Sequence, residues 1–136
     1  MKQKFSNKWK RSKQKRKQRK FKANAPLHTR HKLVSGNLSK ELRKKYGKRS
    51  LPVRKGDEVK VMRGKFKGKK GKINEINLTK LRASIEGIQR QKKDGTKVNV
   101  YFNPSNLQIQ TLNLEDKNRN KVLGRKSGGE NVSEKK

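Results

Sequence analysis

The sequence that decides the fold runs from Lys55 to Ile73 and reads KGDEVKVMRGKFKGKKGKI. Val59 and Val61 alternate with polar neighbours, and this apolar period of two indicates a strand with one buried and one solvent-facing side. A basic loop follows and leads into a second strand. Glycine lets a backbone turn tightly and lets a polyanion approach the peptide N–H groups. The loop glycines are Gly64, Gly68 and Gly71.

The charges of this stretch predict a surface that contacts phosphates. The alternative is a glycine-rich hairpin whose charged side is only solvated. A nucleotide-binding P-loop is not predicted, because Ile73 stands where Ser or Thr is needed and Phe66 stands where the first glycine is needed. Phe66 is expected either to stack on a base or sugar or to plug one end of the domain. The residues expected to contact phosphates are Arg54, Lys55, Arg63, Lys65, Lys67, Lys69, Lys70 and Lys72.

The same alternation recurs downstream, in residues 81–86, 98–102 and 107–110. Asp94-Gly95 between two of these segments is a strong hairpin signal. Ile73 and Ile76 break the period of two, which predicts a bulge. Several short strands without interleaved helices predict a small β-barrel over residues 51–112 that closes its own edges.

Short helices are expected on both sides of this barrel. Residues 23–50 are predicted to be a helical lead-in, with one helix from Pro26 that ends before Gly36 and another capped by Ser39 and ended by Gly47. Residues 113–136 are predicted to form a C-terminal extension, in which Asp116 caps a short helix and the last residues are mobile.

The N-terminal residues 1–22 contain twelve Lys or Arg and no acidic residue. Like charges at this density keep an isolated segment disordered. We therefore expect a disordered arm that becomes ordered on RNA, although a tail that only adds solubility is the alternative. Trp9 is expected to anchor the arm in an RNA crevice or against a neighbouring protein. The other arm residues expected to contact RNA are Arg11, Arg16 and Arg19.

Composition narrows the class of partner. The 136 residues include 42 Lys and Arg against 10 Asp and Glu, a net charge of +32. A compact protein with that charge calls for a polyanion, which can be RNA, DNA or an anionic membrane surface. No apolar run approaches the ~20 residues of a membrane span.

Catalysis and cofactors find little support in the sequence. The chain has no cysteine, so thiolate catalysis and cysteine-bound metals are excluded. Acidic residues are scarce, and no paired general acid and base emerges. A metal shared by the two histidines lacks a third ligand, so phosphate or base contacts are preferred for them. We expect no enzyme, cofactor, metal or small-molecule substrate. The expected RNA contacts in this region are His28, Arg30, His31 and Lys32.

The stretch from Lys55 to Ile73 resembles the KOW motif of ribosomal and transcription-elongation proteins. With residues 85–88 and the basic hairpin after them, it is similar to the universal large-subunit ribosomal family counted as protein twenty-four in bacteria. Residues 25–28 and 38–46 resemble the archaeal and eukaryotic branch of that family. The resemblance covers roughly residues 23–123, and the basic arm departs from the branch pattern by its length and lysine content.

The resemblance implies a mostly β protein, with an SH3-like barrel (the KOW domain), short N-terminal helices and basic extensions. It implies a structural constituent of the large ribosomal subunit in the cytoplasm. The expected partners are large-subunit ribosomal RNA, bound near its 5′ region early in assembly, and neighbouring large-subunit proteins near the exit of the nascent-peptide tunnel. Two alternatives remain open: a transcription-elongation KOW module, and a DNA-compacting basic protein that would leave the barrel pattern unexplained.

Overall fold

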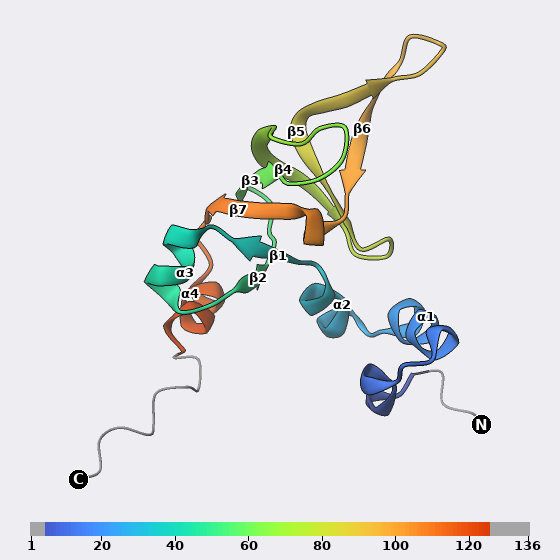
Figure 1. Ribbon diagram of the computed structural model, residues 1–136, viewed down its shortest axis with the longest axis vertical. Helices are drawn as coiled ribbons and strands as arrows, with labels where there is room; N and C mark the ends of the chain where they lie inside the picture. Colours follow the sequence, from blue (N-terminus) through green and yellow to red (C-terminus); the bar gives the residue numbers. More distant parts are fainter. Residues whose placement is uncertain (1–4, 126–136) are drawn as a thin grey trace.

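A computed structural model describes residues 5–125 as a strongly curved sheet with short helices at its margins (Figure 1). In the described residues the sheet has seven strands in the hydrogen-bonded order β2-β1-β7-β3-β4-β5-β6. This mostly β architecture confirms the predicted class and is consistent with a small SH3-like domain. The strands are β1 (Ser35–Leu38), β2 (Ser50–Pro52), β3 (Glu58–Val61), β4 (Lys70–Asn77), β5 (Arg82–Gln91), β6 (Lys97–Phe102) and β7 (Leu107–Thr111).

The helices are short, and local capping explains where several of them begin and end. Ser39 accepts a hydrogen bond from the Leu42 N–H, and Gly47 ends the same helix in the left-handed region with φ 61°. Asp116 caps the last helix by accepting from the Asn118 N–H. These three caps were predicted from the sequence. The helical elements are η1 (Asn7–Arg11), α1 (Lys15–Asn24), α2 (Leu27–Leu33), α3 (Lys40–Tyr46), η2 (Pro104–Asn106) and α4 (Lys117–Gly124).

Strand pairing is antiparallel except where β1 runs parallel to β7. The register between β4 and β5 shifts between Ile73 and Glu75, which confirms the predicted bulge. The hairpin between β5 and β6 turns at Asp94-Gly95, and the Lys92 N–H donates to the Thr96 carbonyl at 2.9 Å. This hairpin projects away from the rest of the sheet (Figure 1).

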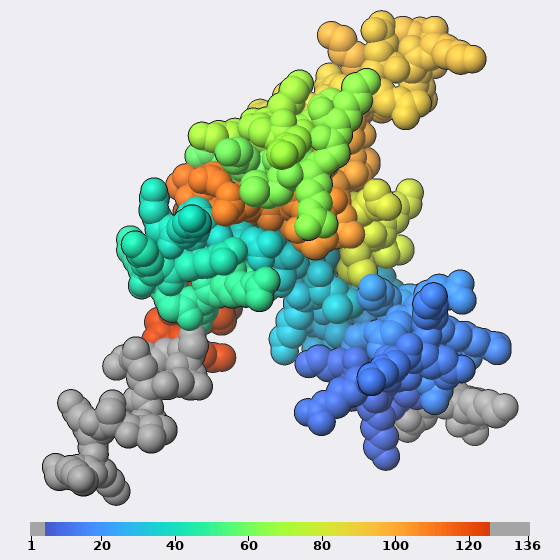
Figure 2. Space-filling model, viewed as in Figure 1, coloured from blue at the N-terminus to red at the C-terminus, as the bar shows by residue number. Residues whose placement is uncertain are grey.

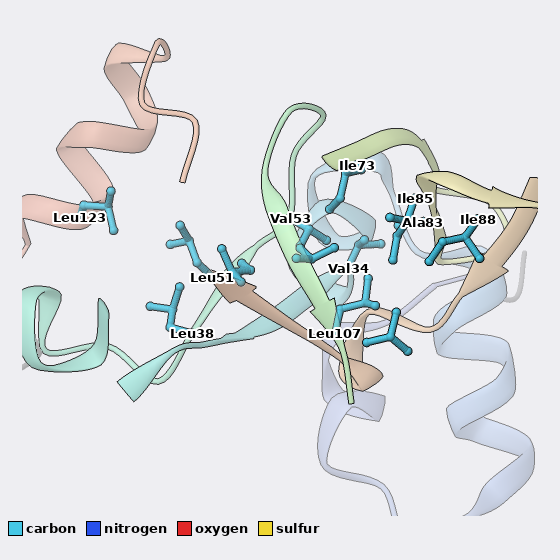
Figure 3. Close-up of a cluster of buried hydrophobic side chains, with 13 residues drawn as sticks. Val34, Leu38, Leu51, Val53, Ile73, Ala83, Ile85, Ile88, Leu107 and Leu123 are labelled. Atoms are coloured by element: carbon cyan, nitrogen blue, oxygen red, sulfur yellow. The ribbon is translucent and has the colours of Figure 1, made fainter. Parts of the chain in front are cut away.

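The core lies inside the curve of the sheet (Figure 3). Val59, Val61, Leu107 and Ile109 are completely buried, as the alternation on β3 and β7 predicted. Leu38 is also completely buried, although it lies upstream of the predicted barrel. The core therefore draws on more of the chain than residues 51–112.

The helical prediction for residues 23–50 was wrong over Ser35–Leu38, which form β1. Gly36 does not end a helix; it pairs with Leu51 in β2 and lies under Val53. A side-chain carbon at Gly36 would come within 3.2 Å of a Val53 methyl. Four residues are too few for alternation to be recognised, and pairing with β2 and β7 decides their conformation.

The N-terminal segment forms a lobe beside the barrel, blue in Figure 2. Its rings Phe5 and Phe21 are 5.1 Å apart, and Phe21 is buried. The Gln18 amide donates to the carbonyls of Trp9 at 2.8 Å and Ser12 at 2.7 Å, which ties η1 to α1. These contacts give the described part of the arm a helical form where the sequence predicted disorder. The predicted change between the free and RNA-bound arm stays a prediction, and the predicted mobile tail lies outside the described residues.

Candidate nucleic-acid interface

The loop between β3 and β4, residues 62–69, is a compact hydrogen-bonded turn. The Gly68 N–H donates to the Val61 carbonyl at 2.8 Å, and the Lys67 N–H donates to the Gly64 carbonyl at 3.0 Å. Gly64 and Gly68 both have φ 90°, a backbone conformation that L side chains rarely adopt. The loop is therefore held in one shape by its own backbone, as the spacing of its glycines predicted.

The basic side chains of this loop project into solvent. Arg63, Lys65, Lys67, Lys69 and Lys70 are all exposed, and Lys72 is exposed further along β4. None of these six forms an ion pair with any residue in the described range 5–125. Unpaired cations on a rigid turn can neutralise phosphates without a large ordering cost. We call this set the loop cations.

Arg54 and Lys55 lie at the opposite end of β3 from the loop cations. Arg54 forms an ion pair with Asp116, and its N–H donates to Asp57 at 2.8 Å. The backbone N–H of Asn118, reinforced by the Arg54 charge, lowers the pKa of the Asp116 carboxyl. The structure therefore divides the predicted phosphate contacts into two sites, because β3 separates residue 55 from residue 63.

A buried ion pair joins the last helix to the barrel, and the sequence analysis did not identify it. The guanidinium of Arg119 donates to both Asp57 oxygens, at 2.6 and 2.7 Å. Asp57 is completely buried and also accepts the Asn113 N–H at 3.0 Å. The role of this pair is to hold α4 against the strands. No sequence signal distinguishes Arg119 from the other basic residues.

The predicted contacts upstream of the barrel differ in availability. His28, His31 and Lys32 are exposed on α2. Arg30 is instead engaged by the fold, because it donates to the carbonyls of Ala25 at 2.8 Å and Ala23 at 2.7 Å. It thereby binds carbonyls at the C-terminal end of α1, so it is a weaker candidate for RNA contact.

The arm presents a second basic surface. Arg11, Arg16 and Arg19 are exposed, whereas Trp9 is half-buried in η1. Helix α1 carries six Lys or Arg among its ten residues and no acidic residue. The predicted arm contacts are therefore accessible as a group, on a face that the barrel does not cover in Figure 2.

Phe66 packs against the barrel core and meets Phe102 edge to face, with 5.8 Å between the ring centroids. This is the packing role of the two that the sequence left open. Neither alternative excludes the other, because Phe66 also lines a surface groove.

The described part of the chain shows no other kind of site. Within residues 5–125, His and acidic side chains do not gather in a group of three or more that could hold a metal ion. The helices in the same range are all too short or too polar to cross a membrane.

The fold and its exposed cations define a class: a small, highly basic SH3-like barrel protein with helical extensions. Comparison with known proteins is more specific. The family described as the eukaryotic ribosomal proteins L26 and their archaeal counterparts matches residues 12–126. The chain belongs to this family of ribosomal proteins, and its relatives are structural proteins and not enzymes. This assignment confirms the resemblance drawn from the KOW stretch and the flanking motifs.

Individual relatives agree with the family. The chain is 45% identical over 115 residues to the large ribosomal subunit protein uL24 of Methanosphaera stadtmanae, covering 85% of this chain and 98% of that protein. It is 47% identical over 110 residues to the large ribosomal subunit protein uL24 of Korarchaeum cryptofilum, covering 81% of this chain and 84% of that protein. The similarity therefore spans the barrel and both flanking regions.

Proposed function

We propose that this protein binds large-subunit ribosomal RNA through the loop cations and through the basic surface of its arm. The observation that carries the proposal is a rigid turn with exposed cations that no acidic residue in the described range neutralises. The charge of +32 needs a polyanion, and membership of a ribosomal family favours RNA over DNA. Phosphate contacts of this kind position a protein on RNA and release counterions.

The finer parts of the proposal rest on the family. The chain acts in cytoplasmic ribosomes, beside other proteins of the large subunit. It joins early in assembly, near the 5′ region of the RNA, and comes to lie near the exit of the nascent-peptide tunnel. Sedimentation tests the first of these statements: the protein should stay with the large subunit after a high-salt wash. Loss of the protein from that fraction in high salt would contradict it.

The RNA surface is tested by replacing Lys65, Lys67, Lys69 and Lys70 with glutamine in the full chain. All four side chains are exposed, so the fold should be unchanged by circular dichroism. Affinity for large-subunit ribosomal RNA should fall, and the log–log slope against salt should decrease by about 0.7–0.9 for each phosphate that the variant no longer neutralises. A matched control replaces Lys92, Lys93, Lys97 and Lys121, which are exposed but lie outside the loop. An equal reduction of affinity in both variants would show that the loop has no special role.

A further inference from the structure

A groove lies between the β3–β4 loop and the β5–β6 hairpin, and it has a volume of about 670 Å³. In Figure 1 the loop passes across the hairpin, which agrees with the contact between Phe66 and Phe102. The groove is lined by Lys65, Phe66, Gln89, Arg90, Gln91 and Val100. The sequence analysis did not connect these residues, because about 25 positions separate the loop from the hairpin strands.

The lining combines an apolar floor with a cationic and amide rim. Phe66 and Val100 supply the apolar surface, and no acidic residue lines the groove. Lys65 from the loop and Arg90 from β5 are both exposed. An aromatic ring flanked by cations is the arrangement on which single-stranded bases stack while their phosphates are neutralised.

The amide side chains have hydrogen-bonding capacity to spare. Gln89 donates to the Asn99 side chain at 3.2 Å, and Gln91 donates weakly to the Gly95 carbonyl at 3.4 Å. Each of these bonds uses the amide nitrogen of the glutamine, so its carbonyl oxygen remains available to accept from a ligand. The amides are thus oriented by the hairpin, and each can still contact the edge of a base.

We infer that this groove binds one unstacked nucleobase of the RNA, with its ring on Phe66, its edge toward Gln89 and Gln91, and its flanking phosphates near Lys65 and Arg90. The inference rests on the proposed RNA-binding function and makes it specific: the loop recognises an unpaired nucleotide and not only a duplex backbone. The Lys69 ammonium lies 5.5 Å from the centre of the Phe66 ring. Because Lys69 is exposed, it can move to a phosphate when a base arrives.

The test compares two strands of equal charge and of about ten nucleotides. One is a single-stranded RNA of mixed sequence, and the other is an abasic strand of the same length. The full chain should bind the strand with bases more tightly, and Phe66→Leu should reduce this ratio by about 5- to 150-fold. Phe66→Tyr, which keeps an aromatic ring, should retain the ratio. Lys67→Gln is the matched control, and it should weaken both strands equally.

An unchanged ratio in Phe66→Leu, with the fold intact by thermal melting, would overturn the inference. That result would also be expected if an acidic segment of a neighbouring protein occupied the groove instead. Failure of the unmodified chain to bind either strand would overturn the proposed function as well, so the two failures are distinguishable.

A second measurement needs no substitution. Ultraviolet crosslinking of the unmodified chain to the strand with bases should yield adducts in the peptide that contains Phe66 or in the β6 peptide that contains Val100. Crosslinks confined to the N-terminal arm would count against the groove.

Discussion

Gly71 marks the place where β4 passes closest to β5. A side-chain carbon there would lie 2.7 Å from a methyl of Ile85 and 3.0 Å from the Glu86 carbonyl oxygen. Gly71→Ala should therefore lower the free energy of unfolding by about 1–3 kcal/mol, because both contacts belong to the packed sheet. Urea denaturation measures the change. Gly124→Ala is the control, because nothing lies within 4 Å of that position. Equal unfolding midpoints for the two variants would contradict the argument.

Gly64 and Gly68 are required for a different reason. Open space surrounds both, but each has φ 90°. Gly64→Val or Gly68→Val should cost about 1–3 kcal/mol through backbone strain alone. Asparagine tolerates left-handed backbone better than valine, so Gly64→Asn should cost less than Gly64→Val. Thermal melting of the variants gives the order, and a valine variant as stable as the asparagine variant would refute the role of φ.

The sequence predicted that these glycines matter but did not separate the two causes. Gly71 was grouped with the loop glycines, yet it lies in β4 and serves close packing. Gly36 was expected at a turn, yet it lies in a strand. A glycine signals a missing side chain, and only the folded neighbours show whether backbone conformation or space requires it.

At the scale of elements, the link between Asp57 and Arg119 decides where α4 lies. Arg119→Met would leave a completely buried carboxylate without its cation, which costs about 3–5 kcal/mol. Lys121→Met on the same helix is the control, and its exposed side chain predicts a change within about 0.5 kcal/mol. Chemical denaturation of both variants provides the comparison. Similar midpoints would show that the buried pair contributes little.

Elements were predictable where a local pattern was long enough or a cap was present. Helix α3 was recognised from Ser39 and Gly47, and β3 from alternating valines. Strand β1 was missed because its four residues form no readable pattern. Arg119 was missed because a buried arginine cannot be distinguished by sequence among 42 basic residues. Both omissions concern contacts between distant segments, which local propensity does not encode.

At the scale of the whole molecule, the folding unit is larger than the barrel that the sequence outlined. A fragment of residues 48–115 would lack Val34 and Leu38, which are almost completely buried, and also Arg119. We expect this fragment to show no cooperative thermal transition. A fragment of residues 34–125 keeps the strand β1 and the helix α4, so it should unfold cooperatively. Cooperative melting of the shorter fragment would mean that the barrel is independent of both flanks.

The candidate interface was predictable in composition but not in arrangement. The loop cations were expected together and lie together, since they follow one another along a tight turn. Arg54 and Lys55 were assigned to the same surface, but the strand β3 places them beside α4. Arg90 was not predicted because only the hairpin brings it to the groove beside the loop. Charge counts predict the kind of partner, and topology decides which charges act together.

The arm raises the last question of scale, because its order depends on the partner as much as on the chain. Helix α1 has ten residues, six of them basic, and its N-cap Gln14 makes no side-chain hydrogen bond. Like charges four residues apart, as in Lys15–Arg19 and Arg16–Lys20, each destabilise a helix by about 0.2–0.5 kcal/mol. Against this stand the Phe5–Phe21 contact and the hydrogen bonds of Gln18. A polyanion removes the repulsion, so it should shift the balance toward the helix.

We therefore predict that residues 1–22 are disordered in the free protein at low ionic strength and become ordered on ribosomal RNA. Amide hydrogen exchange should show fast exchange in α1 without RNA and protection with it. Salt alone should raise α1 helicity partway, because it screens the like charges. Helix α3 is the internal control, because it has a serine cap, Glu41 in its first turn and Gly47 at its end, and its protection should not depend on RNA. Amides of α1 that are already as protected as those of β7 without RNA would show that the aromatic contact outweighs the repulsion, and that the arm meets the RNA already folded.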